Sequence, residues 1–322
     1  MRTKVNLRAL HVGAGALALA VPGAAVALES GAAQALGATA GPALHTSVSR
    51  HSLRYDHDLT VNGTAPSGDT GRKVQLQFLA GGHSSWRGLQ ETTVRSDNRF
   101  SFRVRLARSG RLRAVSVPAS ATSSTPVAQA AATPPSPSDP QRVGVMASLQ
   151  VPRRSRVSQT GHRISLRGRL LPTQGGLTVR LLGRSARSWR TLARARTGRR
   201  GGFVLRYAVR GTGTRLLRVN FRGDASNRGN WVRAGSVTGL VPRVASWYND
   251  GGNTACGFHA RFGVANRTLP CGTKVTVAYH GRSVLATVDD RGPYVGGRDY
   301  DLNQNTAGAL GMYGVATVLT SR

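Results

Sequence analysis

Lysine and acidic residues are scarce in this 322-residue chain. Only three lysines occur among the 45 Lys and Arg residues, and Asp and Glu together number 13, so arginine carries most of the formal net charge of +32. The excess is uneven: residues 243–322 hold 8 basic and 5 acidic residues, a net +3, whereas the preceding residues hold 37 and 8, a net +29. Many like charges sum to a long-range field that attracts polyanions. The partners this suggests are anionic wall polymers or a membrane surface; the alternative is a solvated β surface with an arginine-biased composition.

Aromatic residues are also few, at 6% of the chain. The arginines are scattered along strand-like segments without aromatic interleaving and without a recognisable nucleic-acid reading element. Proteins that bind single strands combine basic grooves with stacked aromatic side chains. We therefore do not expect nucleic acid to be a partner.

Long apolar runs are absent after the amino terminus. Three basic residues precede an Ala-rich apolar stretch, Val12–Ala27, that is interrupted by Pro22. A basic n-region, a short apolar stretch and small residues at alternate positions are typical of a secretory signal peptide. We expect this peptide within residues 1–35 and export to the cell wall; the alternative is an uncleaved membrane anchor. The two candidate cleavage sites are Ala25-Val26-Ala27 and Ala33-Gln34-Ala35.

Cysteine occurs only twice, as Cys256 and Cys271. Neither lies near a cleavage site, so we do not expect a lipoprotein anchor. A paired count in an exported chain favours a disulfide, and two buried free thiols are the alternative. Two cysteines at this spacing lack the second ligand pair of a zinc site, and His259 and His280 lack metal-ligand spacing. We expect no metal and no cofactor.

Two middle segments resemble each other. Trp86 and Trp189, and likewise Phe100 and Phe203, are 103 residues apart, with strand-like segments in the same order around them. Two coincident anchors indicate a duplication. Apolar and polar residues alternate with a period of two, which predicts half-buried antiparallel strands. We predict two immunoglobulin-like β-sandwiches, at residues 44–117 and 144–241. The two tryptophans are expected in their cores, with sugar stacking as the alternative.

The segment between the copies, residues 118–143, is rich in Ala, Ser, Thr and Pro and has no hydrophobic periodicity. Such a composition cannot bury enough apolar surface to fold, so we predict an extended linker.

The carboxy-terminal residues 243–322 have a different composition. Two strand-like runs, 274–279 and 283–288, flank His280-Gly281-Arg282, a predicted tight hairpin. A short helix is predicted over 306–310 and a closing strand over 314–319.

This segment resembles the RlpA family in nearly all of residues 244–322. The resemblance implies an all-β chain that ends in a six-stranded double-psi β-barrel, a fold shared with expansins and some lytic transglycosylases. It also implies action on the glycan strands of peptidoglycan. The two-cysteine form looks like the actinobacterial branch. The matching runs are Ala245–Tyr248, Thr254–Gly257, Ala265–Val275, Asp290–Val295, Gly297-Arg298 and Asp301-Leu302.

The chain departs from the family pattern at two positions. Phe258 stands where RlpA enzymes usually carry Glu, and Asn266 stands where they carry His, while the Asp of the Asp-Arg-Gly-Pro run remains as Asp290. Glycoside hydrolysis ordinarily needs two carboxylates. A lytic transglycosylase can use one group, first as acid on the leaving oxygen and then as base on the muramyl 6-hydroxyl. The resemblance therefore implies a lytic transglycosylase with Asp290 as its catalytic acid and base.

Catalysis by Asp290 requires a raised pKa, and Asp301 or Asp299 are candidates for sharing its cleft, while alternation directs Asp289 to the opposite face. Arg291 is an alternative partner that would keep Asp290 ionised. Two rival functions stay open: a non-catalytic, expansin-like wall-binding or wall-loosening module, and a purely adhesive surface protein. The predicted substrate-binding residues are Trp247, Tyr248, Thr254, Asn266, Arg291, Tyr294 and Asp301.

Overall fold

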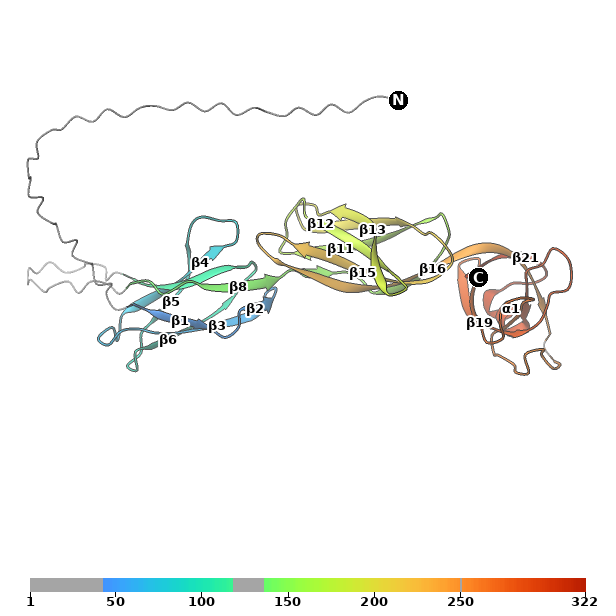
Figure 1. Cartoon of the computed structure of the whole chain (residues 1–322), viewed down its shortest axis with the longest axis horizontal. Helices are drawn as coiled ribbons and strands as arrows, with labels where there is room; N and C mark the ends of the chain where they lie inside the picture. The colour runs from blue at the N-terminus through green and yellow to red at the C-terminus, as the bar shows by residue number, and fades with distance from the viewer. Residues whose placement is uncertain (1–42, 118–135, 250) are drawn as a thin grey trace, which may run out of the picture. The chain divides into compact units, whose positions relative to one another are not determined.

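The computed structural model describes residues 43–117, 136–249 and 251–322 (Figure 1). Apart from one seven-residue helix, its regular elements are all β-strands, so the predicted all-β class is confirmed. The predicted signal peptide and most of the predicted linker lie outside the described residues. Within the described ranges, no helix has the length and apolar character needed to cross a membrane.

The first part of the chain forms two sheets that enclose one core. One sheet has the order β1-β3-β6 and the other β5-β4-β7-β8-β2. Apolar residues at every second position of β3, β4 and β6, such as Leu59, Leu76 and Phe100, meet between the sheets. We call this part the first sandwich. Its strands are β1 (His45–Val48), β2 (Ser52–Arg54), β3 (Asp58–Thr64), β4 (Lys73–Ala80), β5 (Arg87–Thr93), β6 (Arg99–Arg105), β7 (Gly110–Ser116) and β8 (Gln141–Met146).

The next part repeats this plan and is called the second sandwich. One sheet has the order β9-β11-β14 and the other β13-β12-β15-β16-β10, again with one core between them. The two-layer repeat agrees with the predicted duplication, and its immunoglobulin-like type stays a prediction. Its strands are β9 (Ser148–Gln150), β10 (Arg154–Gln159), β11 (Arg163–Leu171), β12 (Thr178–Ser185), β13 (Ser188–Arg196), β14 (Gly202–Ala208), β15 (Gly213–Gly223) and β16 (Arg228–Tyr248).

Two strands differ from the predicted segmentation. Strand β8, whose first residues were assigned to the linker, pairs with β7 and β2 and so belongs to the first sandwich. Its alternate residues Val143 and Val145 are buried there, which explains why this end of a polar segment is ordered. Strand β16 is 21 residues long and contributes to the second sandwich and to the carboxy-terminal domain.

The carboxy-terminal strands close into a ring of six. Going round the ring, β16 pairs with β20, β20 with β17, β17 with β19, β19 with β18, β18 with β21, and β21 with β16. The pairs β16–β20 and β17–β19 are parallel and the other four are antiparallel, and a core made largely of Val, Ala and Leu side chains fills the ring. This is the predicted six-stranded barrel. Its remaining strands are β17 (Gly263–Ala265), β18 (Lys274–Tyr279), β19 (Arg282–Asp290), β20 (Tyr300–Asn303) and β21 (Ala316–Thr320).

Local signals in the barrel sequence produce the expected local structure. His280 and Gly281 connect β18 to β19 with φ values of 45° and 81°. A two-residue hairpin with positive φ at both positions is the type I′ turn, which favours glycine. Helix α1 (Gln304–Leu310) begins after Asn303, whose side chain accepts a hydrogen bond from Thr306 N, and it ends at Gly311 in the left-handed conformation.

The prediction that Trp86 and Trp189 are core residues is wrong. Both are only half-buried, and each ring lies under a guanidinium group, 4.2 Å from Arg113 and 4.3 Å from Arg218 respectively. Alternation shows which residues share one face of a strand with the tryptophan, but it does not show which of the two faces is the inner one. Covering the ring by an arginine is the alternative way to shield it from water.

Candidate active site

Asp290 is the last residue of β19, and it is half-buried. Its Oδ1 accepts two backbone hydrogen bonds of 2.8 Å, one from Ala255 N and one from Arg291 N. Among the described residues, no basic side chain lies within ion-pair distance of this carboxylate, and no donor contacts Oδ2. The backbone therefore fixes one oxygen, and no described donor contacts the other.

A row of four residues crosses the barrel wall at Asp290. Ala265 pairs with Asp290 on one side and with Asp301 on the other, and Asp301 pairs in turn with Ser246. The flanking residues Val264 and Leu302 belong to the core, so alternation directs the row away from it; Asp290 and Asp301 are half-buried, and Ala265 and Ser246 are buried. Two strand spacings separate the Cα atoms of the two aspartates, roughly 10 Å. The small methyl group of Ala265 lies between them.

The carboxyl group of Asp301 has a shifted pKa. Burial raises its pKa above the usual value, and the negative charge of Asp290 adds to this effect. The Ser246 hydroxyl and Arg298 act in the opposite direction. Oxygens Asp301 Oδ1 and Ser246 Oγ are both buried and do not form a well-aligned hydrogen bond with each other. The barrel wall thus contains a second carboxyl group, and the charge of Asp290 affects its pKa.

The guanidinium of Arg291 is directed away from Asp290. It donates to the carbonyl oxygens of Asn266 (3.1 Å) and Leu269 (2.9 Å) and to Cys271 Sγ (3.1 Å). The ion pair between Arg291 and Asp290 that the sequence left open is not present. Asn266 is also engaged: Oδ1 accepts from Thr268 and Leu269, and Nδ2 donates to Asp299 O at 3.1 Å. Both residues organise the loop that follows β17.

The predicted disulfide is confirmed: Cys256 and Cys271 are bonded. It joins this loop to the turn that follows β16, where Thr254 Oγ1 donates to Phe258 O at 2.7 Å. The neighbouring Ala255 supplies an N–H to Asp290. One covalent bond therefore ties together both segments that flank the catalytic candidate.

The other acidic residues of the segment have structural contacts. Asp289 is fully buried, and its Oδ2 accepts from Ala260 N at 2.8 Å, consistent with a face different from that of Asp290. Asp299 Oδ2 accepts from Val244 N at 3.0 Å. Of the two predicted cleft-sharing candidates, Asp301 is the one in the row with Asp290.

Aromatic side chains in this domain differ in exposure. Tyr294, which follows the Asp-Arg-Gly-Pro run, is 83% exposed and Trp247 is 40% exposed. Tyr248 is half-buried and pairs with Asn303 on β20. Phe258, in the disulfide-linked turn, is 41% exposed. Exposed ring faces suit the C–H face of a pyranose.

Sequence reasoning missed Ala265 and Ser246 as members of the site. Both lie inside motifs that matched, but their place beside the aspartates depends on strand pairings distant in sequence. A bulge in β17–β19 sets the register that brings Ala265 opposite Asp290. Within the described ranges, no group of three or more His, Cys, Asp or Glu side chains is arranged to hold a metal ion.

The carboxy-terminal domain is similar to known proteins. Residues 243–320 match the family described as lytic transglycolase. A probable endolytic peptidoglycan transglycosylase RlpA of Synechocystis sp. is 40% identical over 94 residues, which is 25% of this chain and 27% of that protein. Proteins of the same description from Nostoc sp. and Aquifex aeolicus are 36% identical over 100 residues and 43% over 76 residues.

These alignments cover 30% and 21% of this chain, and 24% and 34% of the Nostoc and Aquifex proteins. The chain therefore matches about a quarter to a third of the length of these relatives. The matched segment coincides with the closed six-stranded ring and contains Asp290, Asp301 and the disulfide. The carboxy-terminal domain of this chain belongs to the RlpA-like double-psi β-barrel family.

Proposed function

We propose that the barrel cleaves glycan strands of peptidoglycan by lytic transglycosylation, with Asp290 as acid and then base. The observation that carries the proposal is the arrangement of Asp290, with Oδ1 fixed by two backbone amides and Oδ2 left open. The family relationship and the printed names of the relatives, which describe peptidoglycan transglycosylases, support the substrate class.

The reaction needs one proton to be moved twice. The Asp290 carboxyl donates its proton to the glycosidic oxygen as the bond from that oxygen to C1 breaks. The resulting carboxylate then takes the proton of the muramyl 6-hydroxyl as that oxygen bonds to C1 and closes a 1,6-anhydro ring. The aspartate is regenerated protonated, and no water is consumed. The fixed Oδ1 keeps Oδ2 in place for both transfers.

Asp301 supports this chemistry from a neighbouring position. Its charge, when present, would stabilise the positive character that develops at C1. Its presence also makes a second reaction possible, because a pair of carboxyl groups can hydrolyse a glycosidic bond through an activated water. The end of the product strand distinguishes these reactions: transglycosylation leaves an anhydro end and hydrolysis a reducing end.

A non-catalytic, expansin-like wall-binding module is the alternative. Phe258 and Asn266 replace the usual Glu and His, and the Asn266 side chain already bonds Leu269 N and Asp299 O. On this account Trp247, Tyr294 and Phe258 would stack on sugar rings without cleavage. The proposed location, outside the cell at the wall, is the same for both.

The test is mass spectrometry of products released from glycan strands stripped of stem peptides, using the purified full chain. The variant Asp290→Asn keeps an oxygen that can accept the Ala255 and Arg291 amide bonds, so it should fold. Asp299→Asn is the matched control, because the Asp299 carboxylate accepts a hydrogen bond from Val244 N and is not part of the row that contains Asp290. We expect anhydro products from the wild type and the control, and none from Asp290→Asn.

Three results would overturn the proposal. Reducing-end products would show hydrolysis. Wall binding without soluble products would show the expansin-like alternative. Full activity of Asp290→Asn would remove that residue from the mechanism.

A further inference from the structure

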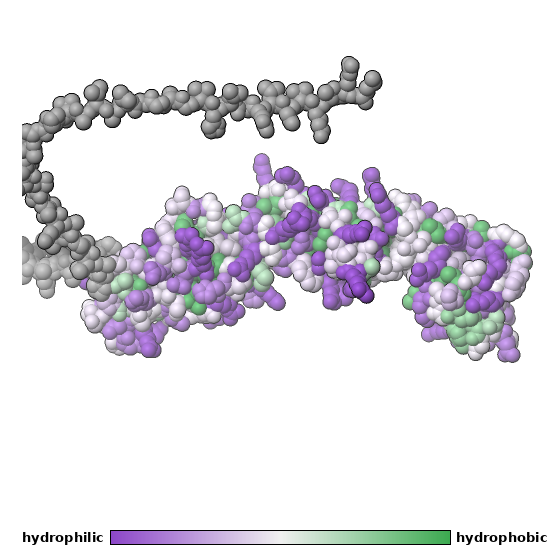
Figure 2. Space-filling view, viewed as in Figure 1, coloured by the Kyte–Doolittle hydropathy of each residue, from purple (hydrophilic) through white to green (hydrophobic). Residues whose placement is uncertain are grey.

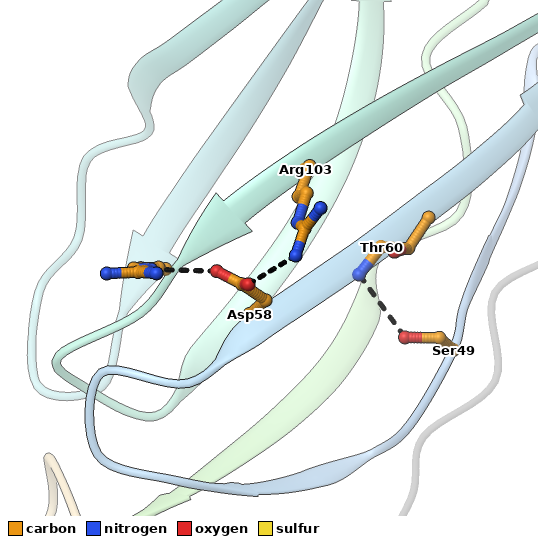
Figure 3. A network of polar contacts seen from close by, with 5 residues as sticks. Ser49, Asp58, Thr60 and Arg103 are labelled. Atoms are coloured by element: carbon orange, nitrogen blue, oxygen red, sulfur yellow. Dashed lines mark hydrogen bonds and ion pairs between the residues drawn. The ribbon is translucent and has the colours of Figure 1, made fainter.

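The second sandwich carries arginines that no acidic group neutralises. Residues 147–241 contain 21 arginines, no lysine and a single acidic residue, Asp224, a net +20. The carboxylate of Asp224 accepts from the backbone of Ser226 and Asn227. Within the described ranges, every ion pair lies in the first sandwich, where Asp58, for example, binds Arg103 at 2.6 Å and Arg105 at 2.7 Å (Figure 3).

Several of these arginines share one sheet face. Arg180 on β12 pairs with Arg194 on β13, and Arg218 on β15 pairs with Arg233 on β16. Like charges directly opposite each other on a sheet are destabilising, so their juxtaposition needs a reason. Figure 2 shows strongly hydrophilic residues over the part of the chain that holds β12 and β13. We call the set Arg180, Arg194, Arg218, Arg222 and Arg233 the arginine face.

The charges of Arg194 and Arg222 act on Arg180. Desolvation lowers the pKa of Arg180, and the charges of Arg222 and Arg194 lower it further. The guanidinium of Arg218 contacts two indole rings, 4.3 Å from the centroid of Trp189 and 5.3 Å from that of Trp231. Trp231 is 50% exposed. The stacked rings limit the freedom of Arg218 before any ligand arrives.

The first sandwich provides an internal comparison. Its Trp86–Arg113 stack corresponds to the Trp189–Arg218 stack. In its equivalent sheet, Gln75 on β4 occupies the position that Arg180 has on β12, with the same alternation of buried neighbours. Gln75 pairs with Glu91, and Arg180 pairs with Arg194. Gln75 Nε2 donates to Glu91 Oε1 at 3.1 Å. The same fold thus accepts an uncharged–acidic pair at this position, so folding does not require two arginines there.

The charge balance of the two copies also differs. The described residues of the first sandwich, 43–117 and 136–146, hold 13 basic and 6 acidic residues, a net +7. A bias toward arginine across the whole chain would decorate both copies alike. The excess lies in one copy, where Arg180 pairs with Arg194 at the position at which the other copy has the Gln75–Glu91 pair.

We propose that the arginine face binds a linear phosphodiester polymer of the cell wall. The planar guanidinium fork matches the two free oxygens of a phosphodiester, and these remain charged at any pH of the wall. Neighbouring arginines are about 5 Å apart across strands, which suits an extended polyanion lying on the sheet. The choice of a wall polymer over nucleic acid rests on the proposed function of the barrel; the anion site itself does not.

The test is direct binding of poly(glycerol phosphate) to the purified full chain, at about 0.05 M and 0.2 M salt. The double variant Arg180→Gln/Arg194→Glu introduces the pair that the first sandwich already has. The matched control is Arg163→Gln/Arg167→Glu on exposed positions of β11, in the opposite sheet, which removes the same net charge. We expect the first variant to weaken binding at least tenfold and the control to change it less than about twofold. Binding of the wild type should weaken at the higher salt concentration.

Equal losses in the two variants would refute a specific face, because net charge alone would then explain binding. Tighter binding of double-stranded DNA, of polyglutamate or of phosphatidylglycerol vesicles than of poly(glycerol phosphate) would refute the assigned ligand. Glycan cleavage is not part of the assay, so the proposal and the barrel's catalysis can fail independently. Circular dichroism of both variants checks that each sandwich is folded.

Discussion

Breaking the Cys256–Cys271 disulfide should destabilise the barrel and loosen the support of Asp290. The bond closes a loop with a sequence separation of 15. In the chain-entropy model, such a loop contributes about 3 kcal/mol to the free energy of unfolding. Since 1.4 kcal/mol is a factor of ten, the ratio of folded to unfolded barrel should fall by roughly a hundredfold. The effect should centre on the two segments that the bond joins.

Hydrogen exchange measured by mass spectrometry can resolve this effect by segment. The amides of Ala255 and Arg291, which donate to Asp290, should exchange faster in Cys256→Ala/Cys271→Ala than in the oxidised wild type. Reduced wild-type protein serves as the control, because it lacks the bond but keeps the sulfur atoms. Amides in β3 and β11 of the sandwiches should not change.

Unchanged exchange of both amides, together with an unchanged urea midpoint of the barrel, would refute this reasoning. It would mean that hydrogen bonds alone, such as Ala255 N to Asp290 Oδ1 and Arg291 to Leu269 O, hold the two segments in place. Faster exchange throughout the chain would equally contradict the local role assigned to the bond.

Three further predictions concern single residues. Gly263→Ala should destabilise the barrel by at least about 1–3 kcal/mol in urea unfolding, because a Cβ there would overlap the buried Asp289 carboxylate, whereas Gly252→Ala, in open space, should have little effect. The two arginines lower the pKa of Asp58 to about 2, which an NMR titration can measure. The stability that the ionised Asp58 contributes should be lost as the pH falls from about 4 to 2. A titration midpoint near 3.8 would contradict the pairing. Asp301→Asn should stabilise the barrel at neutral pH. Because the folded-state pKa of Asp301 is raised, the stability of the wild type falls as the pH rises from 3.8 through that pKa. The difference between variant and wild type should vanish at lower pH, and a variant less stable than the wild type at pH 7 would contradict the prediction.

Much of the barrel could be predicted from its sequence because its signals are local or belong to recognised motifs. The hairpin at His280-Gly281 depends on a positive φ that glycine tolerates, and α1 depends on Asn303 as its cap. The Asp-Arg-Gly-Pro run pointed to Asp290 as the catalytic candidate, which stays a prediction. Each of these features is encoded within a few consecutive residues.

The composition of the site could not be predicted in the same way. Ala265 lies between Asp290 and Asp301 because of a parallel pairing with a bulge, which no short pattern specifies. Arg291 was a plausible partner for its neighbour Asp290, yet its long side chain reaches the loop carbonyls instead. The burial that raises the pKa of Asp301 also arises from tertiary packing.

The sandwiches illustrate a different limit. Alternation predicted their strands but not which face of the strands bearing Trp86 and Trp189 would be inner. Both rings lie outside under arginines. The charge difference between the copies could be counted from the sequence, but the placement of Arg180 opposite Arg194 and of Arg218 opposite Arg233 required the strand register.

The most direct test of the central claim is the mass of the glycan fragments that the full chain releases from stripped peptidoglycan strands. Our account predicts fragments lighter by one water than hydrolysis products, as an anhydro end requires, and their absence with Asp290→Asn. Fragments that carry a reducing end, or anhydro fragments formed equally by Asp290→Asn, would contradict it.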